Sequence, residues 1–385
     1  MVKRVILKEI LYLMEKYPVV AVTGPRQSGK TTFLKESFPG FKYVSLEDPR
    51  VRNFFTSDPT GFWNEYNEKV IFDEAQRLPE LFSYIQNAVD ESGKMGQFIL
   101  SGSQNFQLLE NITQSLAGRV ALFKLFPFDF TEMKSAGLLS DNFEDCLVRG
   151  FYPALFSRDL DSSRFYANYI QTYVERDIVS IVNVRDLKQF RMFFRLCAGR
   201  IGQLLNLNSL ANECGISQPT AKSWLNILEA SYIIFQLTPY HKNFNKRVVK
   251  TPKLYFYDTG LACHLLNIKK GGDLMLNPYK GNLFENLIIA ELQKQSDHNS
   301  LNKEFYFWRD SNGHEVDLVS MVGLQYDIYE IKSSKTILSD HFAGLKHFKE
   351  LAQEDVLSST LYYAGNESAN RTNYIIKPWN ETEFT

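Results

Sequence analysis

The residues best suited to chemistry near the amino terminus form a glycine-bounded loop. An apolar run at 19–22 leads into GPRQSGKTT, and an amphipathic stretch follows. The pattern G-x-x-x-x-G-K-[ST] is typical of a loop whose backbone N–H groups surround phosphates at the start of a helix. We expect Lys30 to reach the β and γ phosphates and the Thr31 hydroxyl to bind Mg²⁺. The residues expected to bind the nucleotide are Gly24, Pro25, Arg26, Gln27, Ser28, Gly29, Lys30, Thr31 and Thr32.

A pair of acidic residues follows a buried strand further along the chain. In EKVIFDEAQRLP the apolar run at 70–72 predicts the strand, and Asp73 and Glu74 come directly after it. We expect Asp73 to complete the Mg²⁺ site and Glu74 to orient and activate the attacking water. A glutamate in that second role indicates a hydrolase rather than a protein that only binds nucleotide.

Two further places could contact the nucleotide. In GQFILSGSQN an apolar strand ends near Ser103 and Gln104, and we interpret one of them as a sensor of the γ phosphate. A simple strand-end cap is the alternative. Arg119 precedes the next strand and could act as an arginine finger in a neighbouring subunit, which predicts a homo-oligomer. A solvated or salt-bridged arginine is the alternative at this position.

Five short motifs, GPRQSGKTT, SLEDP, IFDEAQ, LSGSQ and SLAGRV, occur in this order along the first third of the chain. In their order and spacing they resemble the AAA+-type ATPase domain of a large prokaryotic family, which carries a C-terminal domain of formerly unknown function. The resemblance implies ATP as the nucleotide and a parallel sheet of about five strands with helices on both faces. Apolar runs predict strands at matching places, namely 19–22, 43–46, 70–73, 97–101 and 119–124.

A second group of chemically competent residues lies in the last third of the chain. The sequence HEVDLVSMVGLQYDIYEIK predicts two strands joined by a turn. Glu330 and Lys332 are two residues apart in one strand, so they share a face, and Asp317 lies in the adjacent strand. Such carboxylates suit Mg²⁺ or Mn²⁺, which would activate a water for attack on a phosphodiester. Lys332 would position that water or neutralise charge.

These residues resemble the core of the PD-(D/E)xK nucleases. The resemblance implies that Glu285, on a preceding helix, joins Asp317 and Glu330 as a metal ligand. The proline of the nuclease motif is replaced here by Val316, which leaves the ligands intact. WRDSNGHEVDL and YEIKSS are also similar to the C-terminal domain of the ATPase family. The alternative is a solvated hairpin with an ion pair between Glu330 and Lys332, and a nuclease-like fold does not by itself establish catalysis.

The middle of the chain has a helical pattern that includes a helix-turn-helix. In LNSLANECGISQPTAKSWLNILEASYII the first helix ends near Gly215, and Ser217 caps the second. The next segment is typical of a wing hairpin, and no acidic residue lies between Glu229 and Asp258. This region could bind nucleic acid, with DNA preferred to RNA. The alternative is a purely structural lid. The basic residues that could contact a phosphate backbone include Lys242, Lys246, Arg247 and Lys250.

The composition sets limits on these interpretations. With 43 basic and 44 acidic residues, the net charge of −1 produces no global attraction for nucleic acid, so binding must depend on a local patch. The four cysteines include no CxxC pair, which predicts reduced core residues and no zinc site. The N-terminus is amphipathic rather than signal-like, and no run of about 18 apolar residues exists. We therefore expect a cytoplasmic protein without a membrane span.

We expect an α/β protein with four regions. They are a AAA+-type P-loop ATPase domain at 1–142, a helical lid or linker at 143–200, a winged-helix-like domain at 201–268, and an α/β restriction-endonuclease-like domain of the PD-(D/E)xK type at 269–385. The expected function is Mg²⁺-dependent ATP binding and hydrolysis coupled to this nuclease-like domain, acting on nucleic acid. The alternative is an ATP-switched regulatory machine that binds nucleic acid or protein and whose nuclease-like domain is not catalytic.

Overall fold

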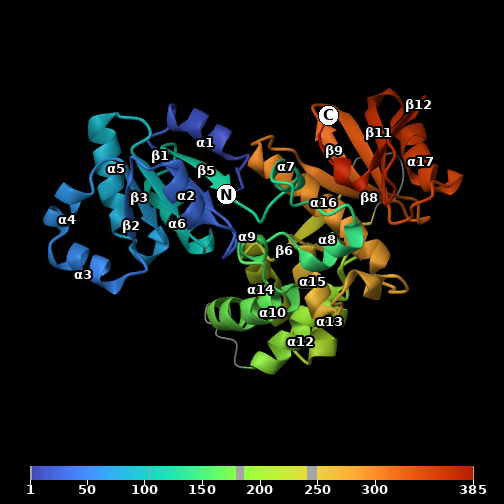
Figure 1. Ribbon diagram of the computed structural model, residues 1–385, viewed down its shortest axis with the longest axis horizontal. Helices are drawn as coiled ribbons and strands as arrows, with labels where there is room; N and C mark the ends of the chain where they lie inside the picture. Colours follow the sequence, from blue (N-terminus) through green and yellow to red (C-terminus); the bar gives the residue numbers. More distant parts are fainter. Residues whose placement is uncertain (1, 104, 179–185, 241–248, 385) are drawn as a thin grey trace. The chain divides into compact units, whose positions relative to one another are not determined.

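The computed structural model describes residues 2–103, 105–178, 186–240 and 249–384. The chain folds into two compact units, each with its own β-sheet (Figure 1). The first unit comprises Met1–Glu132, Ala230–Tyr232 and Asp297–Leu301. The second comprises Met133–Glu229, Ile233–Ser296 and Asn302–Thr385.

The first unit is built around a parallel sheet of five strands in the order β2-β3-β4-β1-β5. Every residue of β1, β3 and β4 is buried, as expected for strands with both faces covered. The parallel sheet implied by the family resemblance is confirmed, and each strand end expected from the apolar runs lies within one residue of the observed end. The strands are β1 (Val19–Thr23), β2 (Lys42–Ser45), β3 (Val70–Asp73), β4 (Phe98–Ser101) and β5 (Val120–Lys124).

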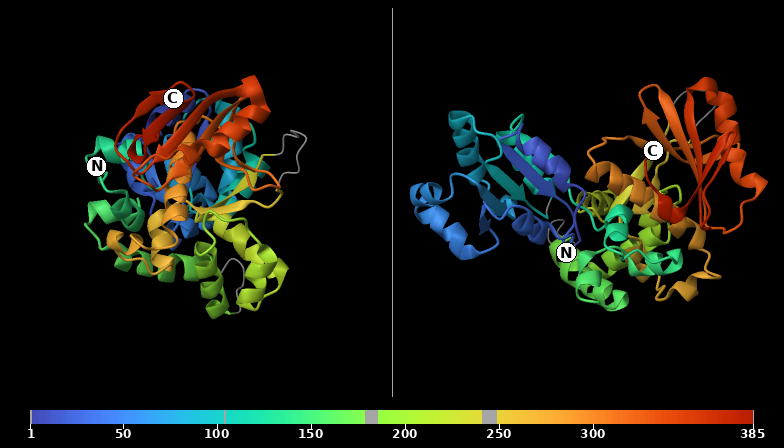
Figure 2. Two further views of the ribbon diagram at one scale, coloured as in Figure 1. Left: turned by 90° about the vertical axis from the view of Figure 1, so that its right-hand side faces the viewer. Right: turned by 45° about the horizontal axis from the view of Figure 1, so that its top comes forward.

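Helices cover both faces of this sheet (Figure 2). Val19 and Ala21 of β1 belong to one hydrophobic core, and Val20 and Val22 belong to the other. This alternation arises because successive side chains of a strand point to opposite faces. The helices of the first unit are α1 (Leu7–Met14), α2 (Lys30–Ser37), α3 (Pro49–Ser57), α4 (Pro59–Glu65), the 3₁₀ helix η1 (Ala75–Arg77), α5 (Leu81–Ser92) and α6 (Asn105–Ser115).

The starts of α3 and α4 follow from their sequences. Asp48 and Asp58 precede a proline at the first helical position, where the missing N–H costs nothing. The Asp48 carboxylate accepts a hydrogen bond from the Arg50 N–H, and the Asp58 carboxylate accepts one from the Gly61 N–H, each at 2.8 Å. These bonds satisfy donors that a helix cannot pair internally.

The second unit combines many helices with one large sheet. The first residues of α7 and the last residues of α16 belong to the first unit. The helices are α7 (Phe130–Ser135), α8 (Phe143–Arg149), α9 (Pro153–Ser157), α10 (Ser162–Tyr169), the π-helix η2 (Ile170–Ile178), α12 (Leu187–Ala198), α13 (Leu207–Cys214), α14 (Gln218–Ala230), α15 (Thr259–Leu265), η3 (Gly271–Leu274), α16 (Lys280–His298), η4 (Ser339–Phe342), α17 (Ala343–Ala352), η5 (Gln353–Asp355) and η6 (Trp379–Glu381).

The sheet of the second unit has eight strands in the order β12-β13-β11-β10-β9-β8-β6-β7. The pairs β8–β9 and β9–β10 are antiparallel, whereas β10–β11, β11–β13 and β6–β8 are parallel. The strands are β6 (Ile234–Pro239), β7 (Lys253–Phe256), β8 (Phe305–Arg309), β9 (Glu315–Val322), β10 (Gln325–Lys332), β11 (Val356–Tyr363), β12 (Ala369–Arg371) and β13 (Tyr374–Pro378).

The strands β6 and β7 follow the predicted helix-turn-helix and form one edge of this sheet. The helices α13 and α14 occupy the predicted positions, and Trp224 of α14 packs edge-on against Phe190 and Phe193 of α12. The boundary expected at residue 268 therefore falls between strands of one sheet. The four expected regions remain a prediction.

A hydrophobic core forms between α17 and the middle of the large sheet. Trp308 of β8 and Ile328 of β10 are fully buried there, and they pack with Leu345 and Phe348 of α17. This packing fixes α17 against the strands that carry Asp317 and Glu330.

Two expectations from composition concern the whole chain. Within the described residues, no helix is both long and apolar enough to cross a membrane. All four cysteines are buried, and none forms a disulfide.

We expect Phe62→Ala to lower the free energy of unfolding by about 3–5 kcal/mol, because the deletion leaves a cavity in a packed core. The Phe62 ring is fully buried and lies 5.3 Å from the Phe55 ring and 6.4 Å from the Phe72 ring. Chemical denaturation followed by circular dichroism measures the change. Tyr12→Ala, at a side chain that is 58% exposed, is the control. Equal losses in the two variants would contradict the packing described here.

Candidate functional site

The glycine-bounded loop connects the end of β1 to the start of α2. A Cβ atom at Gly24 would lie 2.2 Å from the carbonyl oxygen of Leu125, and the backbone there has a φ of +143°. Only glycine fits such a position. Pro25, Arg26, Gln27 and Ser28 complete the loop, and Thr32 lies in the first turn of α2.

Lys30 points back into the loop. Its Nζ donates hydrogen bonds to the carbonyl oxygens of Gly24 and Pro25, each at 2.8 Å. Burial lowers the pKa of Lys30 to about 8, although Glu74 and Asp73 oppose that shift. The ammonium group is therefore held inside the loop, where an anion would stabilise its charged form.

Asp73 lies beside Thr31. The Thr31 hydroxyl donates to the Asp73 carboxylate at 2.8 Å, and the Tyr43 and Ser101 hydroxyls donate to it at 2.6 and 2.5 Å. Burial and the hydrogen bond to Asp73 raise the pKa of Tyr43, so it remains a donor at neutral pH. The carboxyl end of β3 thus meets the start of α2, as the sequence motifs require of a shared site.

Glu74 lies next to the same site in a left-handed backbone conformation with a φ of 56°. Its Oε2 atom accepts hydrogen bonds from the Gln76 side chain at 2.6 Å and from the Ser103 hydroxyl at 3.0 Å. The structure therefore brings Ser103 to Glu74. Gln104, the other predicted phosphate sensor, lies outside the described residues.

Arg119 lies immediately before β5, at the amino end of this strand, whereas Asp73 lies at the carboxyl end of β3. Its guanidinium forms an ion pair with the Asp90 carboxylate at 2.6 Å. This contact agrees with the salt-bridged alternative. A role for Arg119 in the site of a neighbouring subunit stays a prediction.

The buried residue Arg4 supports the phosphate-binding loop, and the sequence analysis did not identify it. Arg4 donates to the Ser28 carbonyl at 2.9 Å, to the Phe126 carbonyl at 2.6 Å and to the Glu132 carboxylate at 2.9 Å. The Arg4 side chain is 4% exposed and that of Glu132 is fully buried. One charge interleaved in an amphipathic stretch carries no signal of burial, so no sequence pattern could have identified it.

The predicted acids of the second unit also come together. Glu330 and Lys332 lie on β10 and Asp317 lies on β9, whose Leu318 pairs with Tyr329. Lys332 forms an ion pair with Glu330, and its Nζ lies 4.0 Å from Asp317. The Ile331 N–H donates to the Asp317 carboxylate at 2.8 Å. The shared face expected from the strand spacing is therefore present.

Glu285 reaches this group from α16 through residues that sequence reasoning did not assign to the site. Its carboxylate accepts hydrogen bonds from Lys253 at 2.9 Å and from Tyr255 at 2.5 Å. Lys253 also pairs with Glu315 at 2.5 Å. Lys253 and Tyr255 are on β7, and the absence of acids around them was the only signal in the sequence.

The electrostatics of the acids favour a bound cation. Burial and then the charge of Glu285 raise the pKa of Asp317 to about 6. Burial and then the charge of Asp317 raise the pKa of Glu330 well above its ordinary value. Within the described residues, Glu330 Oε2 is buried without a hydrogen-bond partner. Buried carboxylates that lack a hydrogen-bond partner are suitable ligands for a divalent cation.

The basic residues expected to contact nucleic acid are mostly beyond what the structure describes. Lys242, Lys246 and Arg247 lie outside the described residues, and Lys250 is exposed before β7. Contact with nucleic acid through this segment stays a prediction.

The lowered pKa of Lys30 predicts how ATP binding depends on pH. Binding requires the ammonium form, so affinity should fall as the pH rises through about 8. At pH 9 about one tenth of Lys30 is protonated, and the apparent Kd should be roughly tenfold larger than at pH 7. Titration with a fluorescent ATP analogue at constant ionic strength measures this change. Lys30→Arg, which stays charged, should bind more weakly but with a flat profile. A parallel fall in that variant would refute the assignment.

We expect Arg4→Met to lower the free energy of unfolding by about 3–5 kcal/mol, because it leaves the Glu132 carboxylate buried without its ion pair. Denaturant titration measures this loss. Arg50→Met is the matched control, since Arg50 pairs with Asp48 on the surface and its side chain is 91% exposed. The control should be unchanged. A loss at Arg4 no larger than at Arg50 would show that the buried pair does not support the fold.

Three domain families match the chain. The AAA domain family matches residues 16–134, which include the loop and the acids of the first unit. Two domains of unknown function, DUF8612 and DUF4143, match residues 140–271 and 280–381. The first match agrees with the geometry around Lys30 and Asp73, and the other two carry no functional description.

Similar proteins are found in bacteria and archaea. The uncharacterized protein Rv2008c of Mycobacterium tuberculosis is 32% identical over 329 residues, covering 84% of this chain and 72% of that protein. The uncharacterized protein MJ1637 of Methanocaldococcus jannaschii is 24% identical, covering 72% and 68%. The Walker-type ATPase PABY2304 of Pyrococcus abyssi, a solved structure, is 15% identical with a TM-score of 0.45, covering 68% and 94%. The chain therefore belongs to the family of the mycobacterial protein, and its N-terminal region is a AAA-type P-loop ATPase domain that binds and hydrolyses ATP.

Proposed function

We propose that this protein is a Mg²⁺-dependent ATPase whose nucleotide cycle controls a metal-dependent phosphodiesterase site in its second unit, with nucleic acid as the substrate. The observation that carries the proposal is the group formed by Glu285, Asp317, Glu330 and Lys332, in which Asp317 and Glu330 are buried. It repeats the residue types and order of the PD-(D/E)xK nucleases.

Residues of the nucleotide site would hold Mg²⁺ and the phosphates. Thr31 and Asp73 lie 2.8 Å apart and would hold Mg²⁺, and both offer oxygen atoms, which this ion prefers. Bound there, Mg²⁺ would neutralise charge that develops on the phosphates. Lys30 would exchange its carbonyl partners for phosphate oxygens. Ser28 Oγ, which is buried without a hydrogen-bond partner among the described residues, offers a further donor to the phosphates.

Glu74 would accept the proton of the attacking water. Its carboxylate lies beside the Asp73 site and is held by hydrogen bonds from Gln76 and Ser103. Those two donors orient the carboxylate, so hydrolysis would depend on their geometry as well as on Glu74 itself. Ser103 could link this carboxylate to the γ phosphate in the role of a sensor.

The second site is proposed to cut phosphodiester bonds. Asp317 and Glu330 would hold a Mg²⁺ or Mn²⁺ ion, with Glu285 completing the acidic group. The ion would lower the pKa of a bound water and stabilise charge on the phosphate. Lys332, which pairs with Glu330 and lies 4.0 Å from Asp317, would neutralise charge on the same face of β10. Lys253 donates a hydrogen bond to Glu285 and holds its carboxylate in place.

Nucleic acid is favoured as the substrate because phosphodiesters match this chemistry and because the segment between Glu229 and Asp258 is free of acids. Contacts to the backbone would come from Lys250 and the basic residues before it. An oligomer of the kind suggested by Arg119 would allow ATP hydrolysis in one subunit to depend on its neighbour.

A cleavage assay tests the proposal. The full chain is incubated with single- and double-stranded DNA and RNA, with Mg²⁺ or Mn²⁺, with and without ATP. We expect metal-dependent cleavage that falls roughly 10²–10⁴-fold in Glu330→Gln and Asp317→Ala, since each removes a group that acts on the reacting phosphate. Glu354→Gln, at an exposed glutamate of η5, is the matched control and should cleave normally.

Lys30→Ala separates the two sites in the same assay. It should abolish ATP hydrolysis and remove the effect of ATP on cleavage, while the acids of the second unit remain intact. ATP hydrolysis at the normal rate in this variant would refute the assignment of the loop. Normal ATP hydrolysis by the wild type without cleavage of any substrate would instead support an ATP-switched binding machine with a non-catalytic nuclease-like domain.

A further inference from the structure

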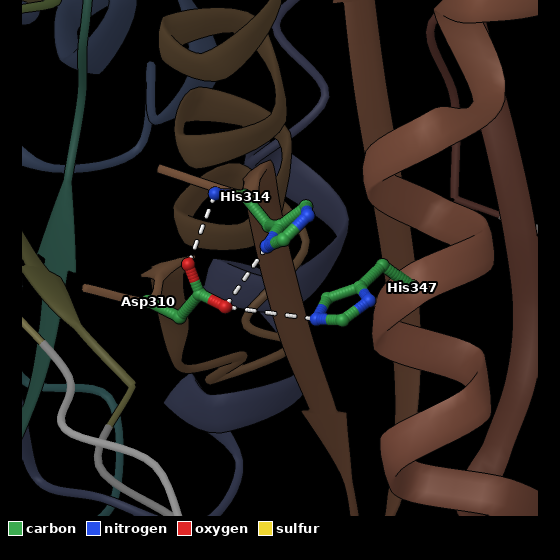
Figure 3. A group of neighbouring side chains, drawn as sticks. All are labelled: Asp310, His314 and His347. Atoms are coloured by element: carbon green, nitrogen blue, oxygen red, sulfur yellow. Dashed lines mark hydrogen bonds and ion pairs between the residues drawn. The ribbon is translucent and has the colours of Figure 1, made fainter. Parts of the chain in front are cut away.

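Three potential metal ligands converge beside α17, and none of them belongs to the acidic group discussed above. Asp310 lies just after β8, His314 lies in the turn just before β9, and His347 lies on α17 (Figure 3). The Asp310 side chain is fully buried, whereas His347 is 22% and His314 is 45% exposed. One carboxylate oxygen of Asp310 faces a nitrogen of each imidazole, as Figure 3 shows.

The separations of these atoms are those of ligands that share an ion. Asp310 Oδ2 lies 3.0 Å from His314 Nδ1 and 3.6 Å from His347 Nε2, and all three ligand atoms lie within 4.8 Å of one another. Bonds of about 2.0–2.1 Å in tetrahedral geometry place two ligand atoms about 3.3–3.4 Å apart. The two separations from Asp310 differ from this spacing by only a few tenths of an ångström. One imidazole would also turn out of the ring stack to direct its nitrogen at a shared zinc ion.

The carboxylate is already oriented for this role. Asp310 Oδ1 accepts hydrogen bonds from the backbone N–H groups of Asn312 and His314 at 2.9 and 3.0 Å. Gly313, with a φ of +89°, completes this turn. One oxygen is thus tied to the backbone, and the other is presented to the imidazoles. Hydrogen bonds that orient a metal-binding carboxylate in this way are typical of metal sites.

The two histidines are also held in place by packing. Their rings stack with centroids 4.0 Å apart and an angle of 22° between planes. The ring of Trp308 packs against that of His347, with centroids 5.9 Å apart. One helical turn before His347, a Cβ at Gly344 would lie 2.0 Å from the Glu315 carbonyl oxygen, so α17 approaches the start of β9 closely. The ligands therefore come from elements whose spacing is already fixed.

We propose that Asp310, His314 and His347 bind one divalent transition-metal ion, Zn²⁺ being the probe of choice, with the remaining position open to solvent beside His314. Two imidazoles and one carboxylate select such an ion over Mg²⁺, which prefers oxygen ligands throughout. The absence of a CxxC pair predicted no zinc site, and this site uses no cysteine. The bound ion would join α17 to the turn between β8 and β9.

This site is chemically separate from the acids of the proposed phosphodiesterase. Those acids offer oxygen atoms alone, whereas this group offers two nitrogen atoms. The turn that carries His314 continues directly into Glu315 and Asp317 of β9. An ion held here would brace that strand without touching the substrate, so the ligands would be positioning residues for any activity at Asp317.

Metal titration of the full chain tests the proposal. The chelator-treated protein is titrated with Zn²⁺ in competition with a chromophoric chelator, and with Co²⁺, whose visible absorption reports the ligand set. We expect one site per chain that competes with the chelator for Zn²⁺. His314→Gln and His347→Gln should each weaken Zn²⁺ binding at least tenfold and remove the Co²⁺ bands. His264→Gln, a half-buried histidine outside the group, is the matched control and should bind as the wild type does.

Asp317→Asn tests whether Zn²⁺ binds to the histidine group or to the acidic group of Asp317 and Glu330. This substitution should leave the Zn²⁺ affinity unchanged. His314 is half-exposed on a turn, so His314→Gln should fold, and an unaltered circular dichroism spectrum and thermal unfolding curve of the full chain would confirm it. Zn²⁺ affinity that survives in both histidine variants, or that disappears in Asp317→Asn, would overturn the proposal. Failure of the wild type to bind Zn²⁺ or Co²⁺ would overturn it as well.

Discussion

The position of Asp73 beside Thr31 is the constraint on which the nucleotide site depends. The strands β1 and β3 are not neighbours, because β4 lies between them. The parallel register places Val22, Ser101 and Asp73 in one row across these strands. Since the carboxyl ends of parallel strands meet at one edge, the loop after β1 and the acids after β3 share a site. A slip of one residue would turn Asp73 to the other face and separate it from Thr31.

Both units hold charged groups away from solvent, and the two cases have different consequences. An ion pair in a core is often no more stabilising than apolar residues of the same size, so its retention calls for another reason. In the first unit Arg4 also binds the Ser28 carbonyl, and the pair shapes the phosphate-binding loop. In the second unit three acids on α16, β9 and β10 face the two lysines 253 and 332. In the proposed function, Asp317 and Glu330 of this group hold a divalent cation.

Local signals explain which parts of the site could be predicted. The spacing of Gly24, Gly29 and Lys30 specifies a loop whatever the rest of the chain does, and apolar runs located all five strands of the first sheet. The two-residue spacing of Glu330 and Lys332 likewise set their common face. The fold of the middle region was harder to predict, because β6 joins the large sheet through backbone hydrogen bonds to β8. Backbone hydrogen bonds do not require particular side-chain types, so the sequence does not indicate them.

By itself, the sequence determined the phosphate-binding loop, the positions of the five strands of the first sheet, and the acids at the end of β3, because each depends on residues close together in the chain. The tertiary structure alone decided that Arg4 supports the loop, that Lys253 holds Glu285, and that His347 meets Asp310 and His314. These contacts join residues far apart in sequence, and their energies come from burial and pairing of charge. Neither quantity exists until the chain has folded, so no local pattern could reveal them.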